Sequence, residues 1–262
     1  MQPVNRFCTV RRHFWLDGLT LTLLAATLLA ADNPPPAVAE KEEAAADRVA
    51  KLIEQLGSDD FGAREKAQSE LAQAGLEAYD ALHAAQSHHD PEIALRARYL
   101  VRSMSVRWFA DSDSPKVVAI LKEYGDLQEA EKRNRIDRLA ALEDRAGVTP
   151  LVRLSRFETL DPLAKYAALQ VMELSPPADD AAKAELANDI ALIIGNSKRP
   201  AAAWLRLYAR TLADPIPTLT EWDQATQAEH AVLEKSPDKS SREIVRDLYR
   251  LQVNLLDRLH RD

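Results

Sequence analysis

The sequence has few glycines, few aromatic residues and one cysteine. Its 262 residues include seven glycines, and aromatic side chains make up 6% of the chain. Long alternating or β-branched runs are absent, which argues against a β-sandwich or a β-barrel. The strong helix formers Ala, Leu, Glu, Arg and Lys dominate instead. The sequence therefore predicts an all-α protein whose small core side chains suit closely stacked helices.

The only long apolar run lies near the N-terminus, at residues 19–31. Basic residues precede it, and its 13 residues are too few to span a bilayer comfortably but fit the core of a signal peptide. Ala37-Val38-Ala39 matches a cleavage motif, and a second candidate cut follows Ala31. An uncleaved anchor is the other interpretation. We expect export, loss of residues 1–39 and no membrane span afterwards.

Cleavage would also remove the single cysteine, Cys8, so the exported chain would hold no disulfide. Residues 1–39 contain three arginines and two aspartates. Their loss reduces 34 basic residues to 31 and 41 acidic residues to 39, giving a net charge of −8. A chain of that sign is a poor match for nucleic acid.

Two helical stripes share one spacing pattern. Apolar residues recur at i, i+4, i+8 and i+11 after Asp60 and again after Asp90-Pro91, which places each set along one side of a helix. The sets are Ala63, Ala67, Leu71 and Ala74, then Ile93, Ala97, Val101 and Met104. Gly147 to Phe157 repeats the spacing of Gly75 to Ala85, and Asp161-Pro162 repeats Asp90-Pro91. Matching glycines, caps and stripes indicate an internal repeat.

The openings Asp90-Pro91-Glu92-Ile93 and Asp161-Pro162-Leu163-Ala164 resemble those of HEAT-like (armadillo-type) repeats, and Phe61 to Leu71 is similar. The resemblance implies a right-handed α-solenoid of stacked antiparallel helix pairs over residues 40–175. Residues 176–262 are expected to continue as helical hairpins similar to tetratricopeptide packing. The helix that opens at Asp90-Pro91 is predicted to reach Trp108. A later helix over about residues 178–194, closed by Gly195, is expected to carry Leu186, Ile190, Leu192 and Ile193 as its apolar positions. Some HEAT-like modules also resemble bilin lyases, but the leader and the missing mature cysteine argue against that activity.

The last helix has two notable features. Ser240-x-x-Glu243 predicts a capping box at its start, followed by an apolar stripe. The stripe consists of Ile244, Leu248, Leu251, Leu255 and Leu259. With no later helix to cover it, the stripe either packs on the preceding helix or forms a docking or homo-oligomerisation face.

Histidines and carboxylates give two weak candidates for chemistry. His83, His88 and His89 are the only clustered metal-ligand types, but their spacing matches no zinc pattern and exposed turn histidines are the favoured interpretation. Asp59-Asp60, with Glu65 and Glu70 on the next helix, could serve acid–base hydrolysis of cell-wall material. Helix capping explains the same carboxylates more simply. No catalytic, cofactor or metal residue is assigned.

Partner binding is the favoured function, because a solenoid builds an extended surface rather than an enclosed pocket. Aromatic residues Trp204, Tyr208 and Trp222 are candidate contact residues, although filling the core is their more common role. Arg242, Arg246 and Arg250 form a basic row that could dock an acidic partner, with ion pairing to neighbouring carboxylates as the alternative. The other candidates are Leu251 and Leu255. The sequence thus favours a non-catalytic periplasmic or extracellular bacterial scaffold that binds proteins.

Overall fold

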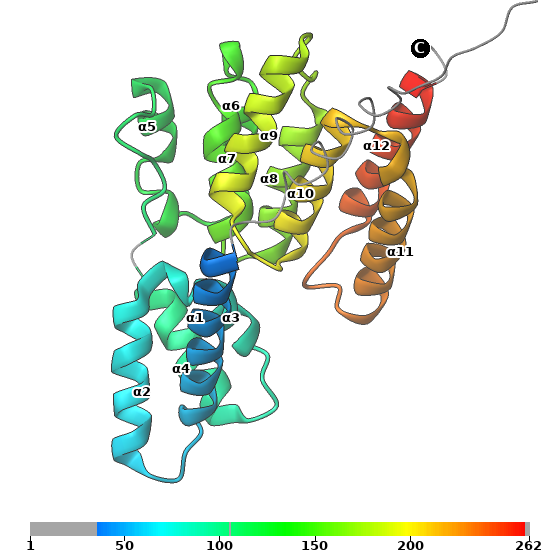
Figure 1. The fold of residues 1–262 in the computed structure, drawn as a ribbon. Helices are drawn as coiled ribbons and strands as arrows, with labels where there is room; N and C mark the ends of the chain where they lie inside the picture. The colour runs from blue at the N-terminus through cyan, green and yellow to red at the C-terminus, as the bar shows by residue number, and fades with distance from the viewer. Residues whose placement is uncertain (1–35, 105, 260–262) are drawn as a thin grey trace, which may run out of the picture. The chain divides into compact units, whose positions relative to one another are not determined.

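The computed structural model describes residues 36–104 and 106–259, and these two ranges form helices, turns and loops without a strand (Figure 1). The all-α prediction is confirmed for that part of the chain. The described helices from residue 46 onward belong to one compact unit, and α1 (Pro36–Gln55) begins ahead of that boundary. Most of the predicted signal peptide lies outside the described residues. The predicted cut after Ala39 falls in the first turn of α1.

The first four helices enclose a core of their own. Its members include Leu56, Leu71 and Leu82, all fully buried. The carboxylate of Asp60 accepts backbone N–H groups of the next helix, as an N-cap does. Gly75 ends that helix at φ +58°, a conformation that favours glycine. The helices are α1, α2 (Phe61–Ala74), α3 (Tyr79–Ala85) and α4 (Pro91–Ser103).

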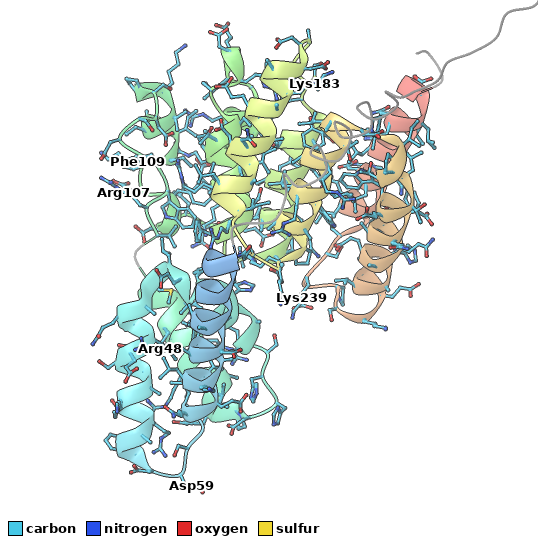
Figure 2. All side chains as sticks on the ribbon, viewed as in Figure 1. Arg48, Asp59, Arg107, Phe109, Lys183 and Lys239 are labelled. Carbon is cyan, nitrogen blue, oxygen red and sulfur yellow. The ribbon has the colours of Figure 1, made fainter. Side chains whose placement is uncertain are left out.

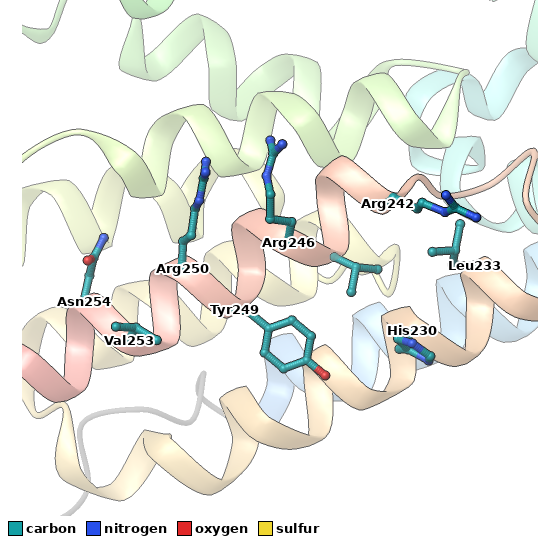
Figure 3. Close-up of a pocket in the computed structure, with 9 residues that line it drawn as sticks. His230, Leu233, Arg242, Arg246, Tyr249, Arg250, Val253 and Asn254 are labelled. Atoms are coloured by element: carbon teal, nitrogen blue, oxygen red, sulfur yellow. The ribbon is translucent and has the colours of Figure 1, made fainter.

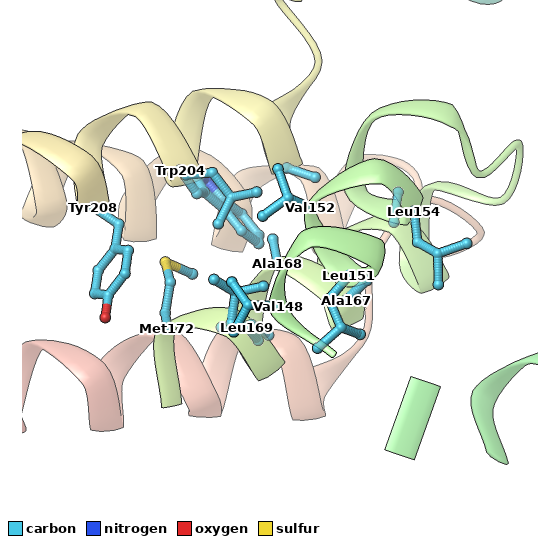
Figure 4. Packing of buried hydrophobic residues seen from close by; sticks show 14 of the residues in the cluster. Val148, Leu151, Val152, Leu154, Ala167, Ala168, Leu169, Met172, Trp204 and Tyr208 are labelled. Atoms are coloured by element: carbon cyan, nitrogen blue, oxygen red, sulfur yellow. The ribbon is translucent and has the colours of Figure 1, made fainter. Parts of the chain in front are cut away.

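The following helices build a second, larger core. Helix α7 packs beside α8 and α9 packs beside α10, while α7 also contacts α9 and α8 contacts α10. Buried side chains therefore continue across residue 175, where the sequence suggested a change of repeat type (Figure 4). The bounds are α5 (Pro115–Leu121), α6 (Glu129–Ala140), α7 (Val148–Phe157), α8 (Asp161–Glu173), α9 (Asp180–Ile194) and α10 (Pro200–Ala213). Single 3-10 turns are η1 (Gly75–Glu77), η2 (Tyr124–Asp126), η3 (Glu143–Arg145) and η4 (Ile216–Thr218).

A polar seam joins the two cores. The Tyr79 hydroxyl donates to the Phe157 carbonyl at 2.5 Å, and His83 Nε2 lies 3.1 Å from the Thr159 carbonyl. Burial lowers the pKa of His83, and the nearby Arg199 guanidinium lowers it further. A neutral imidazole that donates from Nε2 therefore fits this position.

The pairs α3–α4 and α7–α8 share the burial pattern that the repeat predicts. Ala97 and Val101 of α4 are buried, and so are Ala168 and Met172 at the matching positions of α8. The caps differ. Asp90 caps α4 with its side chain, whereas Asp161 lies inside α8 and accepts from Arg199 Nη2 at 2.9 Å.

Two helical details differ from the sequence prediction. Helix α4 ends at Ser103 rather than near Trp108. Trp108 is held in the following loop because Arg153 donates to its carbonyl at 2.9 Å, and its ring lies 5.0 Å from that of Tyr124. Leu192, expected on the apolar side of α9, is 82% exposed. The buried row of α9 is Leu186, Ile190 and Ile194, so Leu192 points to the opposite side.

Candidate docking trough on the last helix

The last two helices, α11 (Leu219–Lys235) and α12 (Arg242–Leu259), form a hairpin against α8. Leu248, Leu251 and Leu255 of α12 are buried in the larger core. The apolar stripe of the last helix thus packs back on its neighbours, one of the two outcomes expected from the sequence. This burial takes Leu251 and Leu255 out of the surface that a partner could contact.

The predicted capping box at Ser240 is wrong. The hydroxyl of Ser241 accepts the backbone N–H of Ile244 at 3.2 Å and caps α12. Ser240 is buried and donates its hydroxyl to the carboxylate of Glu229 instead. A buried acceptor in α11 competes successfully for this hydroxyl, and sequence spacing alone does not reveal such a partner.

A buried ion pair anchors the hairpin to α8. Lys165 Nζ lies 2.7 Å from Glu229 Oε1 and donates to the Lys239 carbonyl at 2.7 Å. The lysine and glutamate side chains are 3% and 2% exposed. Lys239 belongs to the loop between α11 and α12 (Figure 2). One ammonium group therefore binds both α11 and this loop, and it fixes where the hairpin lies on α8.

The outward side of α12 carries two parallel rows of side chains (Figure 3). Arg242, Arg246, Arg250 and Asn254 form a polar row at four-residue spacing. Beside it runs an apolar row at the same spacing, which begins at the buried Val245 and continues with the exposed Tyr249 and Val253. Tyr249 and Val253 are 47% and 63% exposed, although both lie in a regular helix of a well-packed hairpin. Side chains four residues apart lie along one helix side, so each row is continuous.

Together with His230 and Leu233 of α11, these two rows line an open depression of about 890 Å³, which we call the α12 trough. Figure 3 shows Tyr249 extending toward the α11 side, while Arg246 and Arg250 extend in parallel from the other side of α12. The lining contains three guanidinium groups and no carboxylate. The trough therefore has an apolar floor with a cationic edge.

Part of that cationic edge is ion-paired from below. Asp247, 8% exposed, lies 2.8 Å from Arg246 Nε and 3.3 Å from Arg250 Nη1. The two arginine side chains remain 52% and 65% exposed, so donors of each still face solvent. Arg242 has no ion pair with any residue that the structure describes. The ion-paired alternative thus holds for two of the three arginines.

The three aromatic candidates lie in the core. Trp204, Tyr208 and Trp222 are 4%, 2% and 0% exposed. Figure 4 shows Trp204 and Tyr208 among the aliphatic side chains of α7 and α8. The indole N–H of Trp222 donates to Thr211 Oγ1 at 2.9 Å, as a buried tryptophan requires. These rings fill the space between helices and offer no surface to a partner.

The three histidines do not converge. His83 faces Thr159 and Asp161 in the polar seam, whereas His88 accepts the backbone N–H of Asp90 through Nδ1 at 3.1 Å. The His88 and His89 rings lie side by side, with centroids 4.2 Å apart and planes tilted by 37°. Within residues 36–104 and 106–259, no three His, Cys, Asp or Glu side chains are grouped as a metal site would require.

The candidate catalytic carboxylates are arranged as helix caps and ion pairs. Asp59 projects from the turn between α1 and α2 and is exposed (Figure 2), and Asp60 caps α2. Glu65 and Glu70 pair with arginines at 2.9 and 3.0 Å. A hydrolase of this type requires carboxylates facing each other across a cleft. In the described structure Asp60 instead caps a helix, while Glu65 and Glu70 are engaged by Arg96 and Arg48.

No family model matches the chain, and no curated protein and no solved structure matches it either. No helix in the described part of the chain is both long and apolar enough to cross a membrane.

Sequence reasoning found the arginine row but missed the apolar row beside it. The missing signal was the four-residue spacing of Val245, Tyr249 and Val253. Each of these three residues directly precedes a member of the polar row in the sequence. Helix α12 therefore carries exposed apolar side chains in addition to the leucine stripe that packs in the core.

Proposed function

We propose that this protein is a non-catalytic helical-repeat scaffold that binds a partner protein through the α12 trough. The observation that carries the proposal is the second apolar row of α12. The leucine stripe of α12 already packs against α8 and α11. Tyr249 and Val253 nevertheless stay exposed beside the arginine row. An exposed apolar strip edged by charge is typical of protein interaction sites.

A HEAT-like α-solenoid is the architecture that we propose for the stacked helices. The matching burial of α3–α4 and α7–α8 supports it, as does the stacking of α7–α8 on α9–α10. In a solenoid each helix pair contacts its neighbours, and the α11–α12 hairpin likewise packs on α8 through α12.

We further propose that the protein works outside the cytoplasm of a bacterium, in the periplasm or beyond. The support is the N-terminal sequence alone: basic residues, a 13-residue apolar run and the cleavage motif at residues 37–39. A leader of this kind directs the chain to the compartment where the partner would be found.

A crosslinking pull-down with paired variants tests the binding function. The full chain would be expressed with its leader, crosslinked in envelope extract, and compared with Val253→Glu and Leu192→Glu. Both substitutions place a carboxylate at an exposed apolar position, at 63% and 82% exposure, and neither removes core packing. We expect Val253→Glu to lose a specific partner that Leu192→Glu retains. Equal recovery with both variants, or no saturable partner at all, would contradict the proposal.

A further inference from the structure

We infer that the α12 trough accepts an acidic amphipathic helix of about three turns from the partner protein. This inference rests on the proposed function, and it adds the chemistry and shape of the bound segment. Three properties of the trough carry it: its length, the width of its apolar row, and the charge of its edge.

The length of the trough fits a short helix. The lining residues of α12 extend from Arg242 to Asn254. At about 1.5 Å rise per residue they cover about 18 Å, which equals roughly twelve residues of a second helix laid alongside. A helix that contacts this length meets the two exposed side chains of the apolar row, Tyr249 and Val253.

The width of the apolar row favours a helix over a lipid surface. The row is one side chain wide and lies between the arginines and Leu233 of α11. A single ridge of side chains from a packed helix fits such a groove. Helices that lie on membranes instead insert a broad apolar face, and the broad face of α12 is already buried against α8 and α11.

The charge of the edge selects an acidic segment. Arg242, Arg246 and Arg250 repeat every four residues, the interval at which carboxylates on one side of a bound helix also repeat. Arginine pairs well with carboxylates because its planar guanidinium can donate two parallel hydrogen bonds. Arg242 forms no ion pair with the residues that the structure describes, and Arg250 uses one nitrogen for Asp247. Donors therefore remain for a ligand.

Helical peptides offered to the intact chain test this inference. The probe is a fluorescent peptide of about 16 residues, with leucines along one side and glutamates at four-residue spacing next to them. Its counterpart carries lysine in place of each glutamate. Binding by fluorescence anisotropy would be measured for the full chain, for Arg242→Glu and for Arg138→Glu. Arg138 is an exposed arginine of α6 and serves as the charge-matched control.

We expect saturable binding of the acidic peptide that weakens as salt is added, because exposed charges are screened. Arg242→Glu should weaken it by roughly tenfold while Arg138→Glu leaves it unchanged. The native chain should bind the acidic peptide more tightly than the lysine peptide, and Arg242→Glu should reduce this difference in affinity. A second variant, Arg250→Gln, removes charge without placing a new carboxylate beside Asp247. It should weaken binding in the same direction.

Several results would overturn the inference. They are absence of acidic-peptide binding, equal binding of both peptides, or equal effects of Arg242→Glu and Arg138→Glu. Binding to vesicles of anionic phospholipid that the acidic peptide does not displace would assign the trough to a membrane surface instead. The two proposals fail separately. If a pulled-down partner is lost in Val253→Glu but is not displaced by the acidic peptide, the binding function stands and the acidic helix does not.

Discussion

Replacing Lys165 with methionine removes the ammonium group that anchors the α11–α12 hairpin. The substitution keeps a side chain of similar length but leaves the carboxylate of Glu229 buried without its cation. The hydrogen bond to the Lys239 carbonyl is also lost. Breaking a buried ion pair on one side costs about 3–5 kcal/mol. Since Ser240 still donates to the same carboxylate, we expect a loss of about 3 kcal/mol.

Urea and thermal unfolding followed by circular dichroism measure this loss. For a unit of this size, about 3 kcal/mol corresponds to a fall of roughly 10 °C in Tm. The slope of the unfolding free energy against urea concentration (the m-value) should stay the same, because the surface exposed on unfolding hardly changes. Loosening of the hairpin should also weaken partner capture, although no residue of the trough is altered.

The double variant Lys165→Met/Glu229→Gln supplies the control. The introduced glutamine would be neutral and would still offer an oxygen to the Ser240 hydroxyl, so the penalty of an unpaired charge disappears. The loss of unfolding free energy in the double variant should be smaller than the sum of the losses in the two single variants, by about 1–2 kcal/mol or more. Additive single effects, or a loss under about 1 kcal/mol for Lys165→Met, would refute the idea that the pair anchors the hairpin.

Three other substitutions test the fold. Gly147→Ala should lower the unfolding free energy by about 3 kcal/mol in a urea titration, because a Cβ there would lie 1.9 Å from the backbone oxygen of Leu139. Asp90→Ala should cost about 1 kcal/mol in the same assay, since the cap bond to the Glu92 N–H at 2.8 Å is lost. His83→Gln tests how the stability of the fold depends on pH. The folded pKa of His83 lies below its ordinary 6.5, so its contribution is present above that pH and is lost as pH falls through the folded pKa. Thermal melts of the native chain should therefore lose stability on acidification more steeply than melts of His83→Gln, and parallel pH profiles would contradict this assignment.

Local signals in the sequence predicted most of the helices. Asp60 and Asp90 mark the starts of α2 and α4, and glycines mark the ends of α2 and α9. These signals act within one turn, so sequence spacing suffices to find them. The predicted end of α4 was wrong because Trp108 is held by side chains from later helices.

Contacts between distant segments were beyond the reach of the sequence. Lys165 and Glu229 are 64 residues apart, and each looks like an ordinary surface charge on its own helix. Ser240 was assigned to the helix cap for the same reason, since its buried acceptor lies in another helix. The candidate site divides in the same way. The arginine row followed from local spacing, while the burial of Trp204 and the exposure of Val253 depend on which helices pack together.

Site-specific photo-crosslinking in cells tests whether the α12 trough contacts a partner protein. A photoreactive amino acid would replace Tyr249 in the trough and, in a parallel strain, Leu192 on α9, with both chains expressed at equal levels in the native envelope. Both positions are exposed, so exposure by itself gives them similar reactivity. We expect one discrete crosslinked protein from position 249, suppressed by Arg242→Glu, and none from position 192. The same product from both positions, or no product from position 249, would contradict it.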